Sequence, residues 1–161
     1  MSWFITGIKN LVRVTSDIEV NTPMDIPGIG TGAAYTSGEA FGTKFFIPTP
    51  RSGTISNVTF YDLDDEGLDK ELVIFKDQFE ETADNSTFAL SDIDLLQVIG
   101  IAYLSTWSNF GNNQIGLAIP ALSYALPKNK AEQYGLWCQV VTRGADNIAA
   151  GSVPKISMVV V

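Results

Sequence analysis

The chain has 161 residues, a net charge of −8 and no histidine. The missing histidine excludes His-dependent triads, Cys–His pairs and His-ligated zinc sites, and the excess of carboxylates disfavours nucleic acid and anionic membranes as partners. The single cysteine, Cys138, excludes an internal disulfide, and no run approaches the ~20 apolar residues of a membrane helix. We therefore expect one domain over residues 1–161, made in a cytoplasm and without a membrane partner.

The N-terminal part combines an apolar arm, a strand pattern and a long loop. Residues 1–10 lack the basic region and long apolar run of a signal peptide, and we interpret them as an arm. Apolar and polar residues alternate from Val12 to Val20, which predicts a strand. Residues 21–42 are rich in glycine and proline and predict a long loop. The large apolar side chains of the arm are Trp3, Phe4, Ile5 and Ile8.

The segment from Gly28 to Ala33 formally fits the dinucleotide-binding pattern G-x-G-x-x-A. That pattern requires a buried strand before it and a helix after it, so that the pyrophosphate lies at the helix N-terminus. Here Pro23 and Pro27 precede the segment, and further glycines follow it. We interpret it as a surface loop and expect no cofactor.

An acidic turn follows in the middle of the chain. Residues 53–63 predict a strand and residues 71–75 its hairpin partner. The turn from Asp62 to Gly67 resembles the first half of an EF-hand calcium loop, but Val73 stands where that loop has its bidentate glutamate. Two interpretations stay open, an irregular calcium site and a solvated hairpin turn. The missing glutamate favours the turn, with no metal site.

The helix signal of the chain lies at residues 92–98, where Ser91 is a candidate N-cap. Elsewhere short strand patterns alternate with proline, glycine and asparagine. The remaining predicted strands are 43–47, 99–104, 115–119, 122–126, 134–142 and 155–161. About eight or nine short strands predict an all-β fold, a two-sheet antiparallel sandwich that is jelly-roll-like.

Two of the predicted strands are apolar on both faces. Leu72 and Ile74 would face one way and Val73 and Phe75 the other. Residues 155–161 likewise have apolar side chains on both faces of the strand. A sandwich normally leaves one face of each sheet to solvent. Either another chain or a loop of the same chain must then cover the second face. We favour another chain, and so expect a homotrimer or a similar closed oligomer.

Residues with catalytic potential occur in unsuitable settings. Carboxylates cluster at residues 62–71 and at residues 80–81, in a turn and a loop rather than in the sheltered cleft that a glycosidase needs. Cys138 lies in a strand pattern, which indicates a buried hydrophobic residue. We expect no enzyme activity and no catalytic, cofactor-binding or metal-ligating residue. Aromatic and apolar residues are instead the candidates for partner contact: Trp3, Phe4, Ile5, Ile8, Trp107 and Phe110.

Several short segments between residues 35 and 161 have a recognisable order. They are Asn57–Asp62, Glu71–Phe75, Ala83–Phe88, Ser91–Leu96, Ile99–Gly100 and Leu136–Thr142. In this order the chain resembles small virion structural proteins of tailed bacteriophages, of the kind that decorate or cement the capsid. The resemblance implies a jelly-roll-like, oligomeric and often trimeric protein on the outer face of an icosahedral head, without catalytic residues or cofactor. Neither the arm nor the Gly/Pro-rich loop belongs to the resemblance.

The resemblance, the acidity and the two-faced strands together predict a capsid decoration protein that binds the major capsid protein lattice and lies on the virion surface. The alternative is a receptor-binding or head-fibre knob that recognises host glycans, for which Trp107 and Phe110 would face solvent at a tip. A third interpretation, a carbohydrate-active jelly-roll enzyme, requires a carboxylate pair in a cleft. Oligomeric state, glycan binding and cleft geometry discriminate the three.

Overall fold

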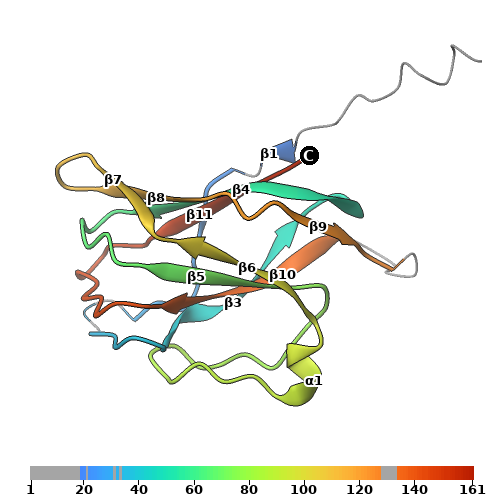
Figure 1. The fold of residues 1–161 in the computed structure, drawn as a ribbon. Helices are drawn as coiled ribbons and strands as arrows, with labels where there is room; N and C mark the ends of the chain where they lie inside the picture. Colours follow the sequence, from blue (N-terminus) through green and yellow to red (C-terminus); the bar gives the residue numbers. More distant parts are fainter. Residues whose placement is uncertain (1–18, 21, 31, 33, 128–133) are drawn as a thin grey trace, which may run out of the picture.

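The computed structural model describes residues 19–20, 22–30, 32, 34–127 and 134–161. In this part of the chain, antiparallel strands form two sheets that lie against each other as two layers, with one short helix, α1 (Asp92–Leu95), outside them (Figure 1). The strands are β1 (Glu19–Val20), β2 (Met24–Asp25), β3 (Ala40–Pro48), β4 (Ser52–Asp62), β5 (Lys70–Phe75), β6 (Val98–Leu104), β7 (Thr106–Asn109), β8 (Gln114–Ala118), β9 (Leu122–Ala125), β10 (Gly135–Thr142) and β11 (Lys155–Val160).

The two sheets differ in size. The larger has the order β1-β11-β4-β8-β7, with β2 also beside β11 and β9 also beside β4. The smaller has the order β3-β10-β5-β6. The paired strands run antiparallel throughout. The predicted all-β, two-sheet antiparallel sandwich with one short helix is therefore confirmed.

The main core lies between the sheets, because alternate side chains of each strand point inward. From β4, Val58, Phe60 and Asp62 share the buried face. From β10, Leu136, Cys138 and Val140 meet them, each fully buried. Burial raises the pKa of the Cys138 thiol, so this residue is a small buried hydrophobic group rather than a reactive thiolate.

The predicted hairpin of β4 and β5 is wrong. β4 pairs with β11, β8 and β9 in the larger sheet, whereas β5 pairs with β10 and β6 in the smaller one. The acidic turn therefore carries the chain from one layer to the other. Two strands joined by a short polar turn look the same in sequence whether they pair with each other or face each other across a core.

The helix begins where predicted but ends earlier than residue 98. Ser91 is its N-cap, and its hydroxyl oxygen accepts a hydrogen bond from the backbone N–H of Asp94 at 3.1 Å. The helix ends at Leu95, and β6 already begins at Val98. The strand β7 was not predicted, because its residues other than Trp107 are polar and show no alternation of apolar side chains.

The described residues of the Gly/Pro-rich segment pack on the chain's own domain. Ile26 and Tyr35 are buried, and the Tyr35 hydroxyl donates to Asp84 at 2.9 Å. The same carboxylate accepts from the backbone N–H groups of Gly30 at 2.9 Å and Gly42 at 2.6 Å. The segment also contains β2 and the beginning of β3, so the prediction of one loop over residues 21–42 is wrong in detail.

The chain itself covers part of the outer face of the smaller sheet. Val73, Phe75 and Val141 form a second buried cluster there with Phe79, whose ring stacks on Phe75 with centroids 3.8 Å apart. Phe79 belongs to the connection between β5 and β6, residues 76–97, which runs below this sheet and includes α1 (Figure 1). For β5, a loop of the same chain therefore covers the face for which we favoured another chain.

Candidate functional site

The acidic turn is held in shape by its own carboxylates. Asp62 is buried and accepts hydrogen bonds from the backbone N–H groups of Asp64 at 2.9 Å and Gly67 at 2.7 Å. Asp64 accepts one from the backbone N–H of Ala149. Asp62 is thus sheltered, and the expectation of a solvated turn is wrong for this residue. Among the described residues, no group of three or more acidic, histidine or cysteine side chains could hold a metal ion.

Next to this turn, Lys70 and Asp146 form a buried ion pair. Lys70 Nζ lies 2.7 Å from Asp146 Oδ1, and the two side chains are 1% and 0% exposed. Nζ also donates to the carbonyl oxygen of Leu68 at 3.0 Å, and the second carboxylate oxygen accepts from the Thr142 hydroxyl. Aromatic rings close over the ammonium with centroids 5.1–5.2 Å from Nζ; they belong to Phe41, Phe60 and Trp107.

Glu66 adds a carboxyl to this end of the sandwich. Burial raises the pKa of Glu66, and the negative charges of Asp146, Asp62 and Asp64 raise it further. The loop after β10, which carries Asp146, thus lies beside the turn between the layers. A carboxyl in such a setting holds its proton to a higher pH than one in water.

The two described aromatic residues that we predicted as partner contacts differ in their setting. Trp107, in β7, is half-buried and packs edge-on against Phe60 with ring centroids 5.9 Å apart. Phe110, in the loop between β7 and β8, is 67% exposed. The structure therefore does not bring both to one exposed tip. The other four predicted contacts lie outside the described residues; they are Trp3, Phe4, Ile5 and Ile8.

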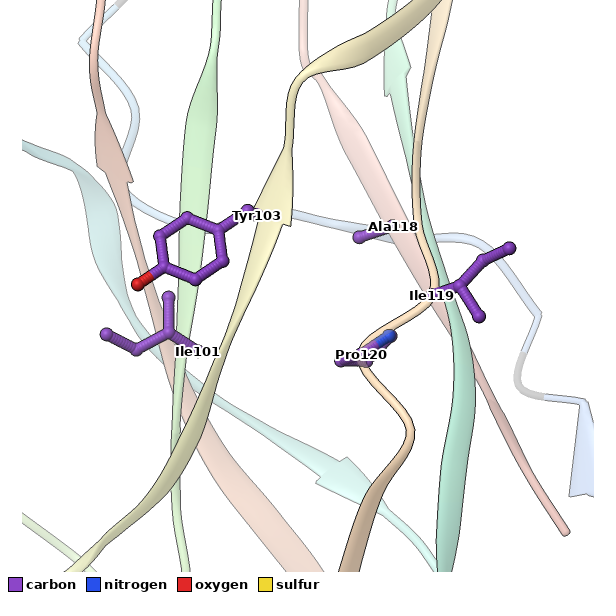
Figure 2. A pocket seen from close by; sticks show the side chains of 5 residues that line it. All are labelled: Ile101, Tyr103, Ala118, Ile119 and Pro120. Carbon is purple, nitrogen blue, oxygen red and sulfur yellow. The ribbon is translucent and has the colours of Figure 1, made fainter.

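A pocket of about 310 Å³ opens at the side of the sandwich. Figure 2 shows Ile101 and Tyr103 on β6 and, across from them, Ile119 and Pro120 on the segment between β8 and β9. Tyr103 and Ile119 are exposed. β6 is also the edge of the smaller sheet, with β5 as its strand partner in the described part of the chain. A strand edge beside exposed apolar side chains is a surface on which another chain can dock.

The helix α1 presents three large apolar side chains to solvent. Ile93, Leu95 and Leu96 are 74%, 60% and 74% exposed. The buried residue of the helix is Asp94, whose carboxylate accepts from the Ser91 hydroxyl at 2.6 Å. Single exposed apolar residues are ordinary, but a contiguous group marks an interaction site. We call Ile93, Leu95 and Leu96 the α1 knob.

The connection that carries the α1 knob is rich in carboxylates. Within residues 76–97 the sequence has one cation, Lys76, and several carboxylates. The exposed ones are Asp77, Glu80, Glu81 and Asp92. Glu80 lies beside the helix, because its backbone N–H points to Asp94 at 3.4 Å. A partner for the knob would therefore be apolar with a basic rim.

The sequence analysis did not select the α1 knob or the buried ion pair. The helix itself carries a signal for the knob. A surface helix normally buries its apolar residues and exposes its polar ones, whereas here Asp94 faces inward and the three apolar residues face solvent. Within the described residues, no helix is long and apolar enough to cross a membrane. Comparison with known protein families, with curated proteins and with solved structures finds no match to this chain.

Proposed function

We propose that this protein is a structural protein of a bacteriophage virion that decorates and cements the capsid by binding the major capsid protein lattice. The α1 knob carries the proposal: an ordered helix holds three large apolar side chains in water, where they cost solubility unless a partner covers them. A compact all-β scaffold suits a permanent binding role. The jelly-roll-like connectivity and the location on the virion surface are parts of the same proposal.

The chemistry of the α1 knob specifies the capsid surface that it fits. Burial of a Leu or Ile side chain contributes about 1.5–3 kcal/mol, and the exposed carboxylates of the connection that carries the knob favour lysine or arginine at the rim of the partner. The capsid contact is therefore an apolar depression with a basic rim. The arm residues Trp3, Phe4, Ile5 and Ile8 form the second contact in this proposal.

The experiment measures rebinding of purified protein to capsids from which it has been removed, by co-sedimentation. We expect Leu96→Ser to weaken capsid binding by about 2 kcal/mol, roughly thirtyfold, because hot-spot residues contribute at least this much. The matched control is Leu63→Ser, which removes an exposed leucine outside residues 76–97. Equal binding of wild type and Leu96→Ser would refute the knob as the contact, and absence of this chain from imaged virions would refute the function.

We propose a homotrimer, with the pocket beside β6 as the contact between copies. Ile119 is 74% exposed and lines this pocket beside the strand edge, and exposed edges of this kind require a cover. We expect light scattering at micromolar concentration to give a trimer for the wild type and a monomer for Ile119→Asp. Tyr103→Phe, which keeps the apolar ring, should remain trimeric. A monomeric wild type would contradict self-association.

The alternative function, recognition of host glycans by a receptor-binding knob, has less support. It requires both Trp107 and Phe110 in solvent, and Trp107 is instead half-buried against Phe60. A stacking platform for sugars needs an open aromatic face.

A further inference from the structure

We infer that Lys70 and Asp146 join in an intramolecular isopeptide bond, an amide between Lys70 Nζ and Asp146 Cγ. The two groups are in contact, with Nζ 2.7 Å from Oδ1, and neither side chain is more than 1% exposed. They lie 76 residues apart in the sequence, so the bond would join the beginning of β5 to the loop after β10. This inference does not depend on the proposed function.

The pair lies out of contact with water. Three aromatic rings and the sheet interior exclude water from Nζ; the rings are those of Phe41, Phe60 and Trp107. Charges are costly to hold away from water, so an uncharged amide product is favoured over a buried ion pair at this position.

The reaction balances without any other reactant. The Lys70 ammonium gives one proton to the Asp146 carboxylate, which leaves a neutral amine beside a neutral acid. The amine nitrogen then attacks Asp146 Cγ, and a second nitrogen proton passes to the departing Oδ1, which leaves as water. Contact between the two groups in the folded chain replaces a bimolecular encounter, and well-oriented groups of this kind reach effective molarities of about 10⁵ M or more.

The hydrogen bonds around the pair fit the product as well as the reactants. In the product, the amide N–H still donates to the Leu68 carbonyl oxygen, which lies 3.0 Å from Nζ in the ion pair. The remaining oxygen, Oδ2, becomes the amide carbonyl oxygen and keeps the Thr142 hydroxyl as its donor. Condensation therefore removes two buried charges and leaves no buried polar atom of the pair unsatisfied.

The test is the intact mass of the full chain, unfolded in acid and measured by mass spectrometry. We expect the wild type to be lighter than its sequence by one water molecule. Trypsin does not cleave after an acylated lysine, so a branched peptide should join residues 52–76 to residues 144–155. A wild-type mass equal to that of the sequence would overturn the inference, and it needs no variant to do so.

Two variants distinguish this bond from other losses of water. Lys70→Arg retains a cation but has no amine that could form this amide, and Asp146→Ala has no acyl group. Both should have the full mass of their sequences. A water deficit that persisted in Lys70→Arg would indicate cyclisation of an aspartate with its own backbone and would overturn the inference. A wild-type deficit without the branched peptide would do the same.

Discussion

Asp146→Ala is expected to lower the free energy of unfolding by about 3–5 kcal/mol, the cost of leaving one partner of a buried ion pair alone. The substitution removes the carboxylate that lies 2.7 Å from Lys70 Nζ and also accepts from the Thr142 hydroxyl. Lys70 Nζ then stays among the aromatic rings of the core, where it keeps its hydrogen bond to the Leu68 carbonyl oxygen but has lost its carboxylate partner. An isopeptide bond would add to the loss, because the wild-type unfolded chain would then contain a closed loop.

Denaturation in urea, followed by tryptophan fluorescence, measures this loss. The matched control is Asp25→Ala, which also removes one partner of a lysine–aspartate pair, with Lys155. Those side chains are 39% and 62% exposed, for Lys155 and Asp25, and we expect a loss of at most about 1 kcal/mol. Equal losses for the two variants would show that burial of Lys70 does not decide the stability of the pair.

The strands were predictable because their side chains obey a local rule. In β4 and β10, apolar residues at every second position mark a buried face. The predicted range 53–63 differs from the observed Ser52–Asp62 by one residue at each end, and the predicted range 134–142 differs from Gly135–Thr142 by one residue at its start. The N-cap at Ser91 is equally local, since it depends on the hydroxyl and a backbone group three residues on.

Features that depend on distant contacts could not be predicted in this way. β7 contains one large apolar residue, Trp107, and is a strand because it pairs with β8, where Gly116 lies opposite. A Cβ atom at Gly116 would lie 2.8 Å from the Trp107 ring, so the glycine makes room for it. Lys70 and Asp146 meet because β5 pairs with β10, with Lys70 opposite Thr142. Nothing near either residue in the sequence indicates the other.

The candidate surfaces also combine a local feature that the sequence shows with a position that depends on distant contacts. The apolar character of residues 93–96 is plain in the sequence, but whether they face the core or solvent depends on where the connection between β5 and β6 lies. Phe79 packs on Phe75, and this contact places the loop below the smaller sheet with the α1 knob outward. The two-faced pattern of β5 was therefore a sound signal for a cover, and the sequence could not distinguish a loop of the same chain from a second chain.

Phe79→Ala is expected to lower the free energy of unfolding by about 3 kcal/mol, near the lower limit for removal of a buried aromatic ring. The ring is 4% exposed and stacks on Phe75. The loop should remain attached, because the Gln139 side chain donates to the Thr82 carbonyl at 2.6 Å and Lys44 Nζ donates to the Phe79 carbonyl at 2.8 Å. The loss is therefore one of packing, and the lower limit applies because a loop relaxes into part of the cavity.

The same variant tests whether the chain covers its own sheet in solution. Loss of the Phe79 ring should expose Phe75 and Val73, so that an apolar fluorescent dye binds Phe79→Ala more than it binds wild type. The control is Phe110→Ala, the same substitution at a 67% exposed ring, for which we expect a change within about 0.5 kcal/mol and no added dye binding. If Phe79→Ala were as stable as Phe110→Ala, the loop would not be the cover of this face. A second copy of the chain would then be required there, because Phe75 and Val73 are too apolar to face water on a stable monomer.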